Sequence, residues 1–230
     1  MKFVLTALSA LALAGPVSAQ TCAIPRDLRA PIAEAPSPHE VVKDVPTAAY
    51  MLALTWSPQY CAGRENARSA RTQCRDNRFG FVLHGLWPNG AGQRHPRYCA
   101  PAQALDVATV RRHLCMTPSP DLLQHEWAAH GVCGWRTPDA YFGQAATLWN
   151  SVKKPGLGFA NGRPITAGDI RRAFVAANPQ LRPNGIYVKV AKGNWLEDVR
   201  ICYDLRFRPA ACSGGVGAPD KVSVRVRSAA

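Results

Sequence analysis

The segment from residue 125 to 133 reads His-Glu-Trp-Ala-Ala-His-Gly-Val-Cys and places several proton-transferring side chains close together. Histidine titrates near neutral pH, so His125 and His130 can each act as a base or an acid. In a helix, at about 100° per residue, Glu126 and His130 lie on one face, whereas His125 and His130 point roughly 140° apart. We therefore expect Glu126 and His130 to form the working pair of this segment.

The spacing of the two histidines argues against a zinc protease. Such enzymes hold the metal with two histidines four positions apart, whereas His125 and His130 are five positions apart. The chain also contains no Cys-x-x-Cys pair. We expect no metal and no other cofactor, although a metal site completed by ligands from elsewhere in the chain stays open.

A second segment, residues 81–89, reads Phe-Val-Leu-His-Gly-Leu-Trp-Pro-Asn. Alternation over residues 78–83 predicts a strand that ends at His84 and turns this histidine to the face opposite Phe81. Trp87 follows three residues later and can stack on a nucleobase. Alone, a histidine is more commonly structural and a tryptophan more commonly part of the core. The conjunction of the two segments favours a catalytic site.

Both segments resemble the active-site motifs of the ribonuclease T2 family. Residues 84–88 match His-Gly-Leu-Trp-Pro in full, and residues 125–133 match His-Glu-Trp-x-Lys-His-Gly-x-Cys at every fixed position but one. Residues 56–61 also resemble the Trp-Pro-x-x-Tyr-Cys segment of that family, so the resemblance spans about residues 50–205. It implies an endoribonuclease that cleaves single-stranded RNA without a metal, through a 2′,3′-cyclic phosphate.

The resemblance implies a role for each side chain. His130 would be the base, His84 the acid, Glu126 a partner of His130 or of the phosphate, and His125 a contact to the phosphate. A carboxylate four residues from His130 is expected to raise the pKa of that histidine and to give an acid-leaning optimum. The attacking group is the 2′-hydroxyl, so RNA is the expected substrate and DNA is not.

Two positions depart from the family pattern. Ala129 stands where the family has a lysine, which removes a positive charge from the transition state and predicts slow turnover unless Arg94 or Arg97 replaces it. Restoring lysine at position 129 is expected to raise the rate if the space is empty. Asn89 stands where many members have aspartate, so we expect a low or altered base preference, with Trp87 and Asn89 as the base-binding residues.

The chain divides into four expected segments. Residues 1–19 contain Lys2, an apolar run and a small-residue cleavage site, which predicts a signal peptide and an exported, periplasmic or secreted protein. Residues 20–48 are proline-rich and expected to be extended, with Cys22 as the evident anchor. Residues 49–212 form the expected ribonuclease domain, and residues 213–230 a tail that is an edge strand or a loose end. No stretch is long enough to span a membrane.

Within that domain, the patterns predict an α+β fold: a single domain with a central antiparallel sheet flanked by helices and stapled by disulfides. The expected strands are residues 50–56, 78–83, 186–190 and 196–207. The expected helices are residues 102–113, 120–130, 138–152 and 168–177, with Thr137 capping the third.

All eight cysteines follow the expected cleavage site, and an even number in an exported chain predicts disulfides in an oxidising compartment. The family pattern suggests Cys99–Cys133 and Cys202–Cys212. The short loop from Cys61 to Cys74 can close on itself, which leaves Cys22–Cys115.

The chain carries 28 basic and 15 acidic residues, a net charge of +13. Such an excess favours a polyanionic partner, nucleic acid above all, or serves only to keep the surface solvated. Two other functions stay open: a catalytically weak RNA-binding homologue or exported ribonuclease toxin, favoured by Ala129, and a cationic membrane-active protein, favoured by charge alone. The sequence does not indicate an oligomeric state.

Overall fold

The computed structural model describes residues 22–157 and 163–229. The signal peptide expected at residues 1–19 lies outside these ranges. In the part of the chain that is described, no helix is long and apolar enough to cross a bilayer.

A four-stranded antiparallel sheet forms the centre of the molecule, which confirms the expected α+β class. The strands are β1 (Ala49–Trp56), β2 (Phe81–Asn89), β4 (Ile186–Ala191) and β5 (Trp195–Tyr203), in the spatial order β2-β1-β5-β4. β4 and β5 form a hairpin whose turn places Gly193 and Asn194 at positive φ. These are two residue types that adopt such a conformation readily.

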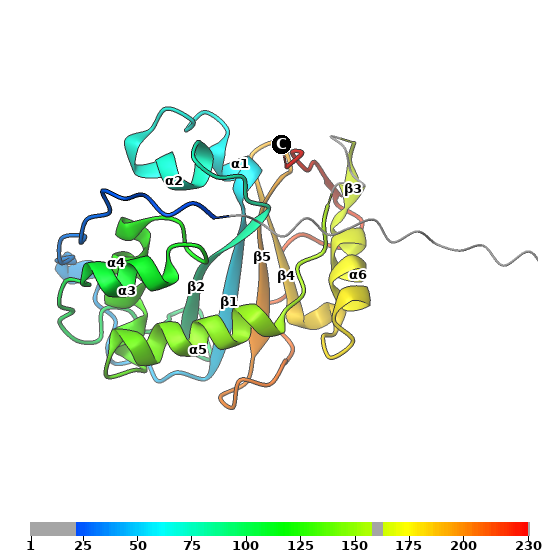
Figure 1. Ribbon diagram of the computed structural model, residues 1–230. Helices are drawn as coiled ribbons and strands as arrows, with labels where there is room; N and C mark the ends of the chain where they lie inside the picture. Colours follow the sequence, from blue (N-terminus) through cyan, green and yellow to red (C-terminus); the bar gives the residue numbers. More distant parts are fainter. Residues whose placement is uncertain (1–21, 158–162, 230) are drawn as a thin grey trace, which may run out of the picture.

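Four longer helices surround the sheet: α3 (Val107–His113), α4 (Pro120–Ala129), α5 (Pro138–Ser151) and α6 (Ala167–Ala177). Figure 1 shows α3 and α4 on the β2 side, α5 crossing in front of the sheet, and α6 on the β4 side. Thr137 caps α5 as expected, by accepting from the backbone N–H of Ala140. The cap of α3 is Asp106, so that helix begins later than residue 102.

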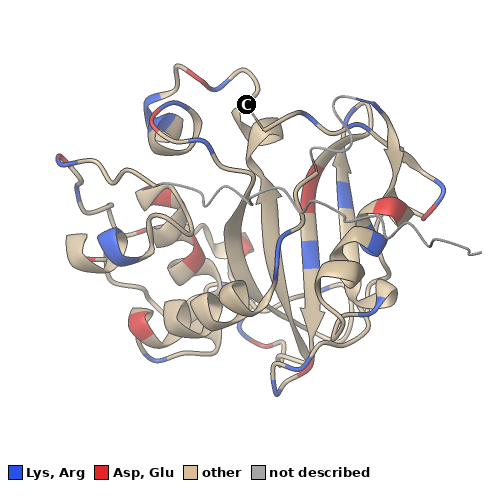
Figure 2. Cartoon of the chain, turned by 45° about the vertical axis from the view of Figure 1, so that its right-hand side comes forward, with Lys and Arg blue, Asp and Glu red and all other residues tan. Residues whose placement is uncertain are grey.

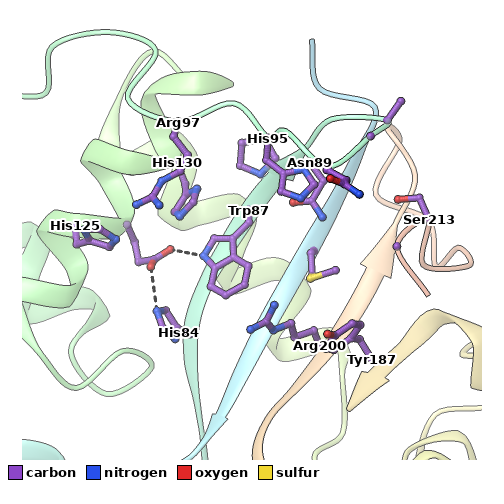
Figure 3. A pocket seen from close by; sticks show the side chains of 17 residues that line it. His84, Trp87, Asn89, His95, Arg97, His125, His130, Tyr187, Arg200 and Ser213 are labelled. Atoms are coloured by element: carbon purple, nitrogen blue, oxygen red, sulfur yellow. Dashed lines mark hydrogen bonds and ion pairs between the residues drawn. The ribbon is translucent and has the colours of Figure 1, made fainter. Parts of the chain in front are cut away.

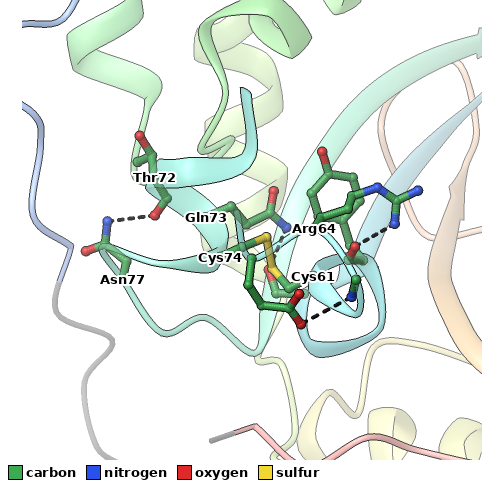
Figure 4. Close-up of a disulfide and its surroundings, with 10 residues drawn as sticks. Cys61, Arg64, Thr72, Gln73, Cys74 and Asn77 are labelled. Atoms are coloured by element: carbon green, nitrogen blue, oxygen red, sulfur yellow. Dashed lines mark hydrogen bonds between the residues drawn. A yellow bond between two sulfur atoms is a disulfide. The ribbon is translucent and has the colours of Figure 1, made fainter. Parts of the chain in front are cut away.

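The loop expected between Cys61 and Cys74 is partly helical. It contains a 3₁₀ turn (Arg68–Ala70) and α2 (Arg71–Cys74), and it follows α1 (Ser57–Cys61), to which the Cys61–Cys74 disulfide joins α2 (Figure 4). Gln73 Nε2 donates to the Ser57 hydroxyl at 2.6 Å and ties the two helices together. These helices are too short to show a periodicity in the sequence.

Two strands differ in length from the expected ones. β2 continues through His84 to Asn89 instead of ending at Leu83, because residues 85–89 pair with β1. β5 ends at Tyr203, well before residue 207, because the chain turns at Asp204 and Phe207 adopts a φ of 57°. The disulfide Cys202–Cys212 closes this turn.

The segments before and after the sheet are tied to other parts of the chain. The N-terminal segment has a single 3₁₀ turn, Pro38–Glu40, among its described residues, and Cys22 is joined to Cys115. In the C-terminal tail, β6 (Ser223–Val224) pairs with β3 (Ile165–Thr166). The tail therefore contains an edge strand, the first of the two alternatives.

The core fills the space between the sheet and the helices. Side chains from β1 and β5 such as Leu52, Leu54 and Ile201 are fully buried there, with Phe142 of α5 and Phe174 of α6. The sheet thus has one apolar face with helices packed on it. Polar and aromatic side chains of β2, β4 and β5 gather elsewhere, around an open cavity.

Candidate active site

An open cavity of about 790 Å³ lies where β2, the end of α4 and the middle of β5 meet. All six residues expected to do chemistry or bind substrate line it. They are His84, Trp87, Asn89, His125, Glu126 and His130. Figure 3 shows Trp87 in the middle of this group, with His84 on one side and His130 beside Arg97 on the other.

A β-bulge brings His84 into the cavity. In the pairing of β1 with β2, Ala53 is opposite Gly85 and Leu54 is opposite Leu83, so His84 is an extra residue without a partner. In a regular strand, His84 and Trp87, three positions apart, would point to opposite faces. The extra residue changes the alternation and lets both side chains face the cavity. The expectation that His84 ends its strand is therefore corrected: it lies within β2.

Thr55 and Asp198 hold the other side of the His84 ring. The Thr55 hydroxyl donates to Asp198 Oδ1 at 2.9 Å and lies 3.3 Å from His84 Nδ1. Since the hydroxyl proton goes to Asp198, the hydroxyl oxygen accepts from Nδ1–H. His84 Nε2 is then the nitrogen that faces Glu126.

Glu126 is buried at the bottom of the site, with only 1% of its surface exposed. Trp87 Nε1 donates to Glu126 Oε2 at 2.8 Å, the Tyr141 hydroxyl donates to the same oxygen at 3.5 Å, and His84 Nε2 lies 3.4 Å from Oε1. Burial raises the pKa of Glu126 to about 8, against the effect of the hydrogen bond from Trp87.

Gly85 makes room for this carboxyl group. A Cβ at position 85 would lie 1.7 Å from Glu126 Oε2 and 2.4 Å from Glu126 Cδ. The glycine after His84 is therefore required by a close approach of side chain to backbone, and not by a positive φ.

Glu126 lies beside His84 as well as near His130, the partner expected from the sequence: potential ligand atoms of Glu126 and His130 lie within 4.8 Å of each other, and His84 Nε2 lies 3.4 Å from Glu126 Oε1. α4 ends at Ala129, and His130 is its C-cap, at φ −124° and ψ −44°, with its backbone N–H still donating to the carbonyl oxygen of Glu126. Burial lowers the pKa of His130 well below its usual range, and the positive charge of Arg97 lowers it further. The expected rise in the pKa of His130 is therefore wrong.

A set of three side chains, His125, Glu126 and His130, has potential metal-ligand atoms within 4.8 Å of one another. A divalent ion would need Glu126 as a carboxylate, whereas burial favours its neutral form. It would also share the cavity with the Arg97 guanidinium, whose charge already acts on His130. The chemistry of this set suits proton transfer better than metal binding.

Known proteins resemble the part of this chain that contains the site residues. Residues 47–157 match the family model described as the Ribonuclease T2 family. This stretch contains β1, β2, α4 and every side chain expected in the site. The four disulfides also join the cysteine pairs that the family resemblance and the spacing suggested: Cys22–Cys115, Cys61–Cys74, Cys99–Cys133 and Cys202–Cys212.

Curated relatives are named ribonucleases. A probable ribonuclease of Haemophilus influenzae is 32% identical over 179 residues, which cover 73% of this chain and 61% of that protein. Ribonuclease I of Escherichia coli is 27% identical over 168 residues, which cover 54% of this chain and 63% of that protein. The chain thus spans less than two thirds of the length of these relatives.

Solved structures share the fold. An RNase-related protein from Calystegia sepium matches with a TM-score of 0.61 and 22% identity, over 80% of this chain and 97% of that one. Trichomaglin, described as an S-like ribonuclease, matches with a TM-score of 0.59 and 19% identity, over 80% of this chain and 98% of that one.

The structure distinguishes the two arginines considered as replacements for the lysine of the Ribonuclease T2 motif. Arg94 pairs with Asp44 at 3.1 Å, and both side chains are largely exposed. Arg97 lines the cavity, and its buried Nε has no hydrogen-bond partner in the described part of the chain. Ala129 itself is fully buried beside Tyr98, so a lysine there would have no free space.

Three charged side chains at or beside the site were not predicted from the sequence: Arg200, Asp198 and Glu34. Arg200 lies over the rings of Trp87, at 4.7 Å, and Tyr187, at 5.3 Å, while its Nη2 donates to Asp198 at 3.0 Å. The alternation of Asp198 and Arg200 in a buried strand was the available signal. The third residue, Glu34, comes from the proline-rich N-terminal segment and contacts His125, and nothing in its local sequence indicated this.

Proposed function

We propose that this protein is an endoribonuclease that cleaves single-stranded RNA by transphosphorylation, in a reaction that needs no metal ion. The observation that carries the proposal is the convergence of His84, Glu126 and His130 on one open cavity that also contains Arg97. The ribonuclease names of its relatives support the same activity. No feature of the site favours a binding protein without catalysis, since both histidines and the carboxyl group are in place.

In the proposed reaction, His130 accepts the proton of the 2′-hydroxyl, and the 2′-oxygen attacks the adjacent phosphorus. The bond between phosphorus and the 5′-oxygen breaks, and His84 gives a proton to that oxygen. One product ends in a 2′,3′-cyclic phosphate and the other begins with a 5′-hydroxyl. DNA lacks the attacking hydroxyl and is not a substrate.

The protonation of the site suits these roles. The pKa of His130 is lowered by burial and by Arg97, so its ring is neutral near pH 7 and ready to accept a proton. Burial also lowers the pKa of His84, while that of Glu126 is raised to about 8. The two adjacent groups therefore hold one proton between them up to about pH 8, and His84 Nε2 can pass it to the leaving oxygen.

Arg97 supplies the positive charge that the family lysine supplies elsewhere. Its guanidinium faces the cavity beside His130 (Figure 3), and within the described residues its Nε atom is buried without a partner. A phosphate group in the cavity would accept hydrogen bonds from this guanidinium, and charge-assisted bonds of this kind stabilise the negative charge of the transition state. His125, on the same wall, would contact the phosphate as well.

In this proposal, Trp87 and Asn89 bind the base of the substrate. Both line the cavity, at the end of β2 farthest from Phe81. The indole of Trp87 is held by Glu126 and lies under Arg200, so the ring is fixed for stacking. The amide of Asn89 can donate or accept, which fits a low or altered base preference.

Export to the periplasm or the medium also belongs to the proposal. The four disulfides need an oxidising compartment to form and persist. The leader expected at residues 1–19 would direct the chain there.

A substrate with an activated leaving group separates the roles of the two histidines. We expect His84→Ala to lose about 10²–10⁴-fold in rate on RNA, but to cleave uridine 3′-(4-nitrophenyl phosphate) nearly as fast as the wild type, because nitrophenolate leaves without a proton. His130→Ala should lose activity on both substrates. His39→Ala is the control, since His39 is an exposed histidine outside the cavity. Equal losses on both substrates for His84→Ala would refute its role as the acid.

A further inference from the structure

The N-terminal segment brings a carboxylate against His125, which lines the cavity. Glu34 lies against His125, whose Nδ1 is 3.0 and 3.1 Å from the two carboxylate oxygens, and it accepts a hydrogen bond of 2.6 Å from the Tyr98 hydroxyl. We propose that Glu34 is a positioning residue, which orients His125 to receive the phosphate of the substrate. This inference rests on the ribonuclease function proposed above.

The hydrogen bond fixes which nitrogen of His125 is available. A carboxylate only accepts hydrogen bonds, so Nδ1 of His125 carries a proton, and Nε2 is the nitrogen left for a ligand. When the ring is protonated, Nε2–H can donate to a phosphate oxygen in a charge-assisted bond. His125 lines the cavity 6.2 Å from His130, measured between ring centroids, so such a phosphate would lie next to the base.

Glu34 is held firmly for a residue without regular secondary structure. Its partner Tyr98 is 5% exposed, and burial together with the bond to Glu34 raises the pKa of Tyr98 to about 12, so the hydroxyl remains a donor. The chain is tied on either side of Glu34: Cys22 is joined to Cys115, and Val42 exchanges backbone hydrogen bonds of 2.8 and 2.9 Å with Arg97.

This carboxylate is not part of the stretch that matches the Ribonuclease T2 family, which begins at residue 47. The two catalytic motifs therefore place His125 in the cavity, while a separate segment of this chain orients its ring. Carboxylate partners that orient a histidine in this way are worth about 10- to 100-fold in activity or affinity at metal sites.

Repulsion of the phosphate by Glu34 is the main physical alternative, since both groups are negatively charged. Both oxygens of Glu34 lie on the Nδ1 side of the His125 ring, so the imidazolium charge is closer to an anion at Nε2 than the carboxylate is. Orientation by Glu34 predicts weaker phosphate binding when its charge is removed, whereas repulsion predicts tighter binding.

Calorimetric titration with inorganic phosphate distinguishes orientation by Glu34 from repulsion by Glu34, and it does not require catalytic turnover. We expect Glu34→Gln to raise the Kd of phosphate about tenfold. His125→Ala should raise it at least as much, and adding Glu34→Gln to His125→Ala should have no further effect. Glu40→Gln is the matched control, because Glu40 lies in the same segment but binds Ser37 instead of the site.

Steady-state kinetics on RNA provide the second readout. Glu34→Gln should raise KM about tenfold with kcat changed by less than about threefold, and Glu34→Asp should restore part of the loss. Phosphate binding by folded Glu34→Gln that equals or exceeds that of the wild type would overturn the inference. A wild type that binds phosphate through Glu34 and His125 but does not cleave RNA would refute the proposed function alone.

Discussion

His84, Glu126 and Trp87 form one connected group, in which a buried carboxyl group bridges an indole N–H and an imidazole. The carboxyl group has a raised pKa, and His84 and His130 have lowered ones, chiefly because of burial. In the proposed mechanism His130 is therefore a neutral base, and the pair of His84 and Glu126 retains a proton.

These protonation states predict a bell-shaped dependence of kcat/KM on pH. Activity should rise with pH in the acid range, below 6.5, as His130 loses its proton, and fall above about pH 8 as the pair of His84 and Glu126 loses its own. In Glu126→Gln the alkaline fall should move to lower pH, because the pKa of His84 itself is lowered by burial. A wild-type profile that still rises above pH 8 would contradict this assignment.

The same substitution separates activity from stability. The pKa of Glu126 rises on folding, from 4.5 to about 8, so its stabilising contribution is complete below pH 4.5 and is lost as the pH rises through about 8. Glu126→Gln should therefore be less active but more stable than the wild type near pH 8, by about 1–2 kcal/mol. Thermal unfolding at several pH values measures this, and the gain should vanish at low pH.

Arg97 and Ala129 give two further predictions at this scale. Arg97→Gln should lower kcat about 10²-fold and shift the acid limb of the pH profile upward, because the charge of Arg97 lowers the pKa of His130. Arg94→Gln, in the same loop but paired with exposed Asp44, is the control and should leave kcat and the acid limb unchanged.

Restoring lysine at the buried position 129 should destabilise the fold by about 3 kcal/mol or more without raising the rate.

At the scale of the elements, the bulge in β2 and the end of α4 bring the two motifs together. The bulge puts His84 and Trp87 on one face, and Gly85 leaves the space into which α4 inserts Glu126. Both β2 and α4 are needed to bring His84 and Glu126 together.

Gly85→Ala tests this contact. Its Cβ would overlap the Glu126 carboxyl group, so we expect a loss of about 10²-fold in kcat/KM and a loss of stability of about 1–3 kcal/mol. Gly143→Ala in α5 is the control, because a Cβ there meets nothing within 4 Å, and it should keep full activity with equal or higher stability. A fully active Gly85→Ala would show that Glu126 need not lie where the structure has it.

Periodicity and capping predicted the elements that are long or well bounded. Residues 138–152 were expected as a helix with Thr137 as its cap, and α5 agrees closely. The short helices between Cys61 and Cys74 have too few residues to show a period, and the bulge at His84 depends on pairing with β1, which is a contact distant in sequence. For the same reason the sequence did not indicate that Glu126 also contacts His84.

At the scale of the whole molecule, the N-terminal segment, the sheet and the C-terminal tail form one body through non-local contacts. Glu34 reaches His125, 91 positions later in the chain, and the carbonyl of Arg227 accepts from Trp56 Nε1 at 3.0 Å. The net charge of +13 is spread over the molecule: Figure 2 shows basic residues on loops, helices and strands instead of in one block. The general charge can attract a polyanion, while Arg97 and Arg200 are the cations at the site itself.

The central claim is that His84 and His130 cleave RNA at its own 2′-hydroxyl. The most direct test is to incubate the purified protein with a single-stranded oligoribonucleotide in EDTA and to determine the ends of the fragments by mass spectrometry, beside His130→Ala and a 2′-deoxy oligonucleotide. We predict 2′,3′-cyclic phosphate and 5′-hydroxyl ends from the wild type, a loss of about 10²-fold or more for His130→Ala, and no cleavage of the deoxy substrate. Cleavage that disappears in EDTA, or that is equal for His130→Ala, would contradict the account.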